Sequence, residues 1–172
     1  RYADPISELA RWSQDHYPAL VQALHEESGI DPEWTRSGLL MLDTSERAEA
    51  LEWAGRFGYA LEEVSGDALR HCEPALTATA EHALWLEAVA QVRNPRLLRA
   101  LHQGLLARGV VFREMSAVSR LLVRAGRITG VATNSGESGA DVVVIAAGAW
   151  SGRLMGALAP EKRVDIRPVR GQ

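Results

Sequence analysis

The run that most constrains the fold is VVVIAA at residues 142–147, which ends at Gly148 and leads directly into the corner AWSG. A strand with one solvated face alternates apolar and polar residues, and this run does not alternate. It is therefore predicted to be a strand covered on both faces, which is typical of parallel sheets. The run indicates an α/β layer in this part of the chain.

The rest of the chain shows two patterns, and the boundary between them lies near residue 92. The first pattern indicates an α+β arrangement of helices with isolated strands. It predicts, in order, a helix from Asp4 to Gly29 that Pro18 kinks or divides, a strand at 39–42, a helix from Thr44 toward Gly58, a short helix between Ser65 and Pro74, and a strand at 83–87.

The second pattern is that of a doubly wound layer whose sheet is covered on one face by a β-meander. It predicts a helix from Asn94 to Gly109, strands at 110–113, 118–124 and 128–133, a loop at 134–139, the strand at 141–147, and a helix from Ser151 through Leu158. No linker rich in Gly, Pro or Ser separates the two patterns. Two interleaved domains are therefore expected.

The corner after residue 147 has two interpretations. Gly148 lies at the carboxyl end of the predicted strand, where ligands of open α/β sheets bind and where the missing Cβ lets a backbone approach a phosphate or sugar. Ser151 can cap the next helix, whose N-terminus favours an anion. Equally, the small residues can serve only to let that helix pack closely on the sheet.

Several function classes are disfavoured by what the sequence lacks. It has neither the G-x-G-x-x-G fingerprint nor a P-loop, and a net charge of −3 offers no basic field for nucleic acid. No apolar run approaches the roughly 20 residues that span a bilayer. The single Cys72 excludes an internal disulfide and suits a reducing compartment, so the cytoplasm is expected. The histidines have no metal-ligand spacing, and no catalytic constellation can be assembled.

Several short segments, taken in order, resemble one family. They are GLL at 38–40, CEPAL at 72–76, NPRLLRAL at 94–101, GRITGV at 126–131, and AAGAWSG at 146–152 followed by RPVRGQ at 167–172. They resemble the FAD-dependent D-amino-acid oxidase family, and most of all its glycine oxidases of thiamine biosynthesis. The resemblance covers essentially the whole chain, although each segment alone recurs across many flavin amine oxidoreductases.

The resemblance implies a fold and a cofactor site. The fold is mixed α/β and α+β: a partial FAD-binding domain, Rossmann-like and of the GR2 type, with a β-meander, interleaved with part of an α+β substrate domain. Residues 1–92 would belong to the substrate domain, residues 93–160 to the FAD domain, and residues 161–172 to the start of a return strand. Backbone groups of Val118 would hold the adenine, and Ala147 and Gly148 would border the pyrophosphate and ribose. No catalytic residue and no metal ligand is expected in this chain.

The resemblance also implies an activity for the full-length protein. Glycine would be oxidised to its imine with FAD as the hydride acceptor, dioxygen would become hydrogen peroxide, and the imine would be used for the thiazole of thiamine. One alternative is a related oxidase or dehydrogenase acting on sarcosine, another N-methyl amine or a D-amino acid. Another is a non-catalytic structural or assembly module in which the corner only packs.

The missing fingerprint leads to an expectation about the chain itself. In the family a βαβ unit with the fingerprint would precede Arg1, and the substrate arginine and active-site tyrosine would follow Gln172. The chain is thus expected to be an internal fragment, inactive alone and binding FAD weakly or not at all. An uncovered strand must be hidden, so a homo-oligomer is expected.

Overall fold

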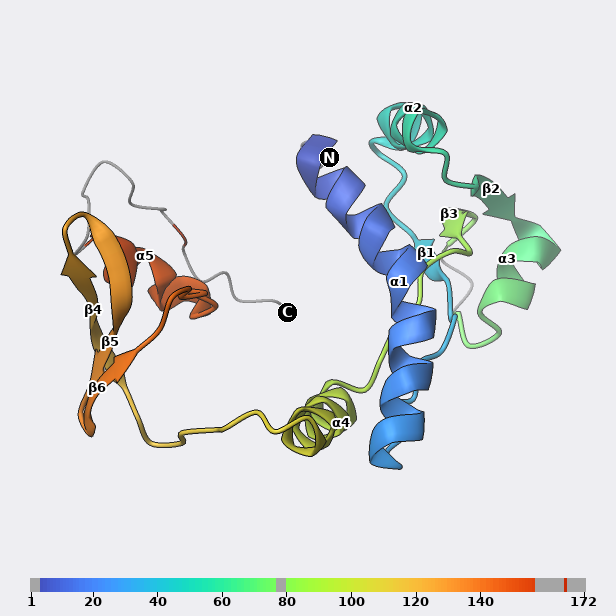
Figure 1. The fold of residues 1–172 in the computed structure, drawn as a ribbon. Helices are drawn as coiled ribbons and strands as arrows, with labels where there is room; N and C mark the ends of the chain where they lie inside the picture. Colours follow the sequence, from blue (N-terminus) through green and yellow to red (C-terminus); the bar gives the residue numbers. More distant parts are fainter. Residues whose placement is uncertain (1–3, 77–79, 157–165, 167–172) are drawn as a thin grey trace. The chain divides into compact units, whose positions relative to one another are not determined.

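The computed structural model describes residues 4–76, 80–156 and 166. The chain divides into two compact units, Arg1–Val111 and Phe112–Gln172 (Figure 1). Both units combine helices with a small antiparallel sheet. The mixed α/β and α+β fold class predicted from the sequence is confirmed. Of the helices in the described ranges, none combines the length and apolarity that crossing a bilayer requires.

Two long helices, α1 (Asp4–Ser28) and α4 (Asn94–Ala107), pack together in the first unit. Their contact buries Leu24 of α1 against Leu97 and Ala100 of α4. Partly buried apolar side chains surround these three, namely Tyr17, Ile30, Val92 and Leu101. Pro18 does not divide α1, which runs through it as one helix.

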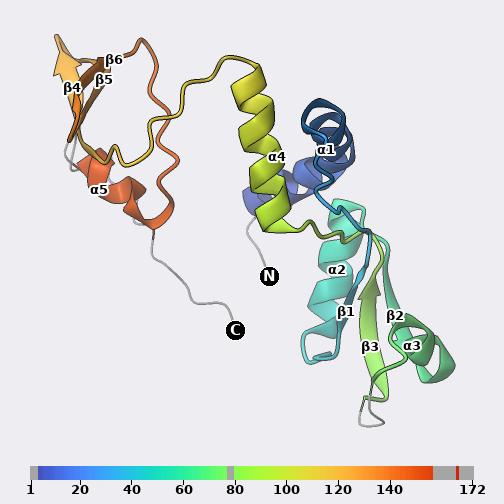
Figure 2. The ribbon, with the colours of Figure 1, turned by 90° about the horizontal axis from the view of Figure 1, so that it is seen from below.

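The sheet of the first unit has three antiparallel strands, β1 (Leu39–Met41), β2 (Leu61–Ser65) and β3 (His82–Leu86), in the order β1-β3-β2. Figure 2 shows the strands side by side, with α3 (Gly66–Cys72) beside β2. Val64, Leu69 and Ala83 form the core between α3 and the sheet. The remaining helix, α2 (Arg47–Phe57), contacts β2 and ends at Gly58 in the left-handed conformation.

Strand β2 was not predicted. Its sequence, LEEVS, places Glu62 and Glu63 side by side and so interrupts the alternation by which a half-buried strand is recognised. It forms because β3 offers it a complete ladder, from Leu61 opposite Leu86 to Ser65 opposite His82. Pairing with the central strand therefore overrides the local pattern.

The second unit is built on the meander β4 (Val118–Arg124), β5 (Arg127–Thr133) and β6 (Gly136–Gly139), in that order. Ala125 and Gly126 both have positive φ, so the β4–β5 connection is a two-residue turn matched to the strand twist. A short 3₁₀ turn, η1 (Gly148–Trp150), leads into α5 (Ser151–Gly156).

Three sequence predictions in this region are wrong. Residues 110–113 form no strand, because no strand of the described residues forms a ladder with them, and Val111 is 78% exposed. Residues 136–139, predicted as loop, form β6 because β5 supplies them with a partner. Residues 142–147 form no strand, and Val142 and Val144 are 81% and 83% exposed. A strand buried on both faces needs neighbours, and the described residues place no strand against this run.

Candidate cofactor site

The corner predicted at the end of residues 142–147 is built around Gly148. Its φ of +53° lies in the left-handed region, while no atom lies within 4 Å of where a Cβ would be. The glycine is therefore needed for the backbone conformation and not for space. The Trp150 N–H donates to the Ala147 carbonyl at 3.0 Å, which closes the turn, and α5 then begins at the buried Ser151.

A cavity of about 660 Å³ lies next to this corner, within the second unit. One wall comes from β4 and its approach, and the other from residues 143–147 and the start of α5. Val118 and Ala147 both line it, so two of the three predicted cofactor-binding residues are brought together from distant parts of the chain. Gly148 is not among the lining residues but directly follows Ala147.

The β4 wall offers unpaired backbone groups. β4 is an edge strand of its sheet, so alternate N–H and C=O groups on its outer side have no ladder partner among the described residues. The ladder shifts register between Val118 and Arg120, and the Ser119 hydroxyl there donates to the Ala132 carbonyl at 3.2 Å. Such a strand edge fits an adenine ring. The ring has hydrogen-bond donors and acceptors along its edge, and its two flat faces are apolar.

The other lining residues are mostly apolar, with one cation that the sequence did not single out. Val143, Ile145 and Leu154 face the cavity, as does Trp150. Arg153 also lines it and forms no ion pair within the described ranges. Its positive charge suits a diphosphate, although α5, with six residues, is too short to add much of a helix dipole. The sequence signal that could have indicated Arg153 is its position, as a basic residue in the first turn after the corner.

The described ranges hold no group of three or more His, Cys, Asp or Glu side chains that could bind a metal ion. His71 and Cys72 are neighbours at the end of α3, where adjacent side chains point apart. The chemistry of this site is therefore that of a ligand held by backbone and apolar groups. Arg170 and Gln172, which carry part of the family resemblance, lie outside the described residues.

A profile of the family described as "FAD dependent oxidoreductase" (DAO) matches residues 1–172, the whole chain. The chain belongs to the DAO family of FAD-dependent oxidoreductases. This confirms the family resemblance, and with it FAD as the cofactor on which the DAO family depends. The edge strand, the apolar lining and Arg153 are compatible with that cofactor.

Within the DAO family, the chain is similar to several individual proteins. The chain is 42% identical over 173 residues to glycine oxidase of Pseudomonas putida, covering 100% of this chain and 47% of the relative. It is 32% identical to hydrogen cyanide synthase subunit HcnC of Pseudomonas aeruginosa, covering 96% of this chain and 41% of the relative. The chain thus spans about half the length of the curated relatives it matches.

Solved DAO structures agree with the fold. The glycine oxidase from Bacillus cereus superposes with a TM-score of 0.81 at 27% identity, covering 91% of this chain and 45% of that one. The glycine oxidase from Geobacillus kaustophilus gives a TM-score of 0.79 at 29% identity, covering 93% of this chain and 44% of that one. Both resemble the present chain in fold and in sequence.

The division into functional domains stays a prediction. The compact units meet between Val111 and Phe112, whereas the predicted substrate and FAD portions meet between residues 92 and 93. Helix α4 packs on α1 in the first unit, and the unit boundary follows that contact. Compactness and functional assignment need not coincide in interleaved domains. The predicted return strand at 161–172 lies almost wholly outside the described residues.

Proposed function

We propose that this chain is a segment of a glycine oxidase and supplies part of its FAD-binding wall. The observation that carries the proposal is the 42% identity to the glycine oxidase of P. putida across the whole chain. The cavity supports it from the structure, because Val118 and Ala147, which are far apart in sequence, line the same mostly apolar space from its two walls.

The chain's own residues have defined tasks in this proposal. The edge of β4 at Val118 holds the adenine by backbone hydrogen bonds, and Ala147 and Gly148 let the pyrophosphate and ribose pass close to the backbone. Arg153 balances the diphosphate charge, while Val143 and Ile145 keep water from the buried part of the cofactor. When bound, FAD supplies the chemistry by accepting a hydride from Cα of the amine and passing its electrons to dioxygen.

Glycine is the substrate proposed, and its imine and hydrogen peroxide are the products. A bifunctional protein ThiO/ThiG of Synechocystis, 27% identical to this chain, supports a role for the imine in making the thiazole of thiamine. The cytoplasm stays the expected compartment, and self-association stays the expected state of the chain.

A second candidate activity has its own support. A D-amino acid dehydrogenase of Allorhizobium ampelinum is 29% identical over 99% of this chain. A dehydrogenase would oxidise the amine equally well and pass its electrons to an acceptor other than dioxygen.

A chimera tests the proposal directly. This chain replaces the matching 173 residues of P. putida glycine oxidase, and peroxide release with glycine, sarcosine and D-alanine is measured. A glycine oxidase segment is expected to support peroxide formation with glycine as the preferred substrate. Amine-dependent dye reduction without peroxide would support the dehydrogenase instead. A folded chimera that binds no FAD would refute both and leave the structural module.

A further inference from the structure

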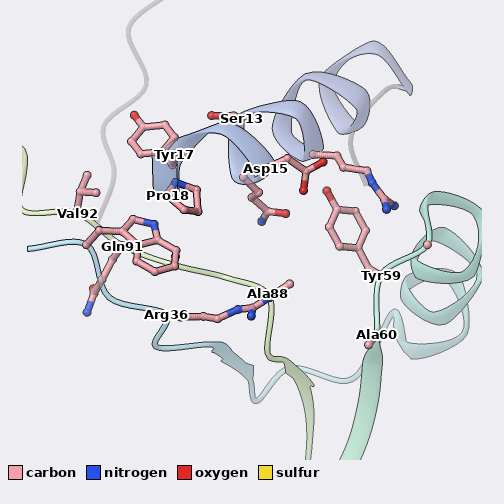
Figure 3. A pocket seen from close by; sticks show the side chains of 15 residues that line it. Ser13, Asp15, Tyr17, Pro18, Arg36, Tyr59, Ala60, Ala88, Gln91 and Val92 are labelled. Carbon is pink, nitrogen blue, oxygen red and sulfur yellow. The ribbon is translucent and has the colours of Figure 1, made fainter. Parts of the chain in front are cut away.

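A second cavity, of about 660 Å³, is lined only by residues of the first unit (Figure 3). The middle of α1 forms one side of it. The opposite side is formed by residues 34–36, 58–60 and 88–92. Its apolar surface comes from aromatic and small side chains, namely Tyr17, Pro18, Trp34, Tyr59, Ala88 and Val92.

Three charged side chains line this cavity: Arg11 and Asp15 from α1, and Arg36 from the facing wall. Figure 3 shows Asp15 on the α1 side, near Tyr59, and Arg36 along the facing wall toward Ala88. Neither side chain forms an ion pair or a hydrogen bond with any described residue. Most other arginines of this unit are engaged: Arg11, for example, donates to the Phe57 carbonyl and lies over the Tyr59 ring at 5.8 Å. Among the described residues, therefore, the Asp15 carboxylate and the Arg36 guanidinium have no ion-pair partner in the cavity.

Pro18 adds an acceptor on the α1 side. A proline inside a helix has no N–H to donate, so the carbonyl of Gln14 lacks the donor that an uninterrupted helix would give it. Gln14 and Pro18 both line the cavity. A mid-helix proline costs about 3 kcal/mol relative to alanine, and here it enriches the Asp15 side of the cavity in acceptors.

Tyr59 forms an uncharged part of the cavity wall beside Asp15 (Figure 3). Its ring stacks on Trp53 with centroids 4.9 Å apart, and Trp53 donates from Nε1 to the Ser7 hydroxyl at 2.9 Å. Burial raises the pKa of Tyr59, opposed by Arg11 and reinforced by Asp15, so its hydroxyl stays protonated at neutral pH. A neutral hydroxyl can donate or accept without competing with a bound anion.

We propose that this cavity binds a small amino carboxylate, with the ammonium group at Asp15 and the carboxylate at Arg36. A guanidinium matches a carboxylate with two parallel N–H donors, and an ammonium group, which only donates, matches the acceptors on α1. The aliphatic part of the ligand lies over Trp34 and Tyr59. Its lining residues are all different from those of the candidate cofactor cavity, and the inference does not depend on the glycine oxidase proposal.

A ligand series tests the charge arrangement. The 172-residue chain is titrated calorimetrically with unbranched amino carboxylates from glycine to 6-aminohexanoate, and with the alkylamine and alkyl carboxylate of each length. One chain length is expected to bind best, because it matches the span between the two charges. The best amino carboxylate should bind about fivefold more tightly than either singly charged analogue, because it forms one additional, partly exposed ion pair.

Two variants with matched controls assign the ends of the ligand. Asp15→Asn should lower the affinity for the best amino carboxylate about fivefold and leave the affinity for the alkyl carboxylate of that length unchanged. Arg36→Gln should also lower the affinity for the amino carboxylate about fivefold, and it should leave the affinity for the alkylamine unchanged. Glu8→Gln on α1 and Arg99→Gln on α4 remove charges outside the cavity and should change nothing. Circular dichroism checks that all variants fold.

The proposal is overturned if no amino carboxylate binds better than its singly charged analogues. It is equally overturned if the Asp15 and Arg36 variants behave like their controls. Neither outcome affects the chimera, whose readouts are FAD content and peroxide, so failure of this site and failure of the proposed function are distinguishable.

Discussion

At the scale of the residue, the packing around Gly38 explains why a glycine stands at this position of the GLL motif. Its φ is +70°, and a Cβ there would overlap the Trp85 ring. Both conformation and space therefore demand glycine. The motif GLL at 38–40 contributes to the family resemblance, and the structure gives its first residue a physical reason. The β1–β3 pairing, which sets Leu40 opposite Trp85, depends on that close approach.

Replacing Gly38 with alanine should lower the free energy of unfolding by more than about 2 kcal/mol, because backbone strain and displacement of Trp85 add together. Gly29→Ala is the matched control, since Gly29 has φ +68° and nothing near its Cβ position. It should lose only the strain, about 1 kcal/mol. Urea unfolding followed by circular dichroism measures the free energy of unfolding of both variants. Equal losses of stability would show that Trp85 does not pack against residue 38.

At the scale of the element, the helices were predictable and several strands were not. Asp4, Pro5 and Gly29 delimit α1 locally, and Asn94 with Pro95 begins α4 where the sequence predicts it. Helical signals are local because each bond joins residues four apart. Strands depend on partners, which is why β2 and β6 were missed. The run at 142–147 shows the reverse case, a strand-like sequence without a paired neighbour in the described residues.

The α1–α4 contact provides a test at this scale. Leu97 is 8% exposed and packs on Leu24, whereas its neighbour Leu98 is 66% exposed. Leu97→Ala should therefore reduce the free energy of unfolding of the first unit by about 2–5 kcal/mol, through lost burial and a cavity. Leu98→Ala, with the same change in helix propensity, should cost under about 0.5 kcal/mol. Similar values for both would mean that α4 packs through another face.

Part of the candidate site could be predicted from the sequence, because some of its signals are local and others depend on residues far away in the chain. A glycine directly after an apolar run is a local signal of a corner, and Gly148 has the left-handed backbone that such a corner needs; its contact with a cofactor stays a prediction. Val118 came from the family resemblance alone, since nothing local marks an edge-strand residue as a ligand contact. The proximity of Asp15 and Arg36 to one cavity could not be foreseen, because it depends on how α1 packs against the loops of the sheet.

At the scale of the whole molecule, the chain carries uncovered apolar surface on residues 142–147. Side chains alternate along this run, with Val142 and Val144 exposed and Val143 and Ile145 partly buried. An extended apolar segment with free backbone groups favours pairing with another chain. Self-association is the consequence expected for this chain, and its contact should include the exposed valines.

Val144→Lys should shift the chain toward monomer, because a charge on the exposed side of the run opposes edge-to-edge pairing. Val111→Lys changes a residue that is 78% exposed but lies outside the run, and should leave the assembly unchanged. Size-exclusion chromatography with light scattering over a range of concentrations distinguishes the two. A wild-type chain that is monomeric throughout would contradict this prediction.

We propose above that this chain forms one wall of an FAD site in a glycine-oxidising enzyme. The most direct measurement is the flavin content of the chimera with P. putida glycine oxidase, from its visible absorbance after gel filtration. We expect close to one FAD per chain. In Gly148→Val the flavin content should fall at least about tenfold, because a β-branched residue cannot adopt the left-handed turn at the corner. A folded chimera without flavin, or a Gly148→Val variant that retains it fully, would contradict the account.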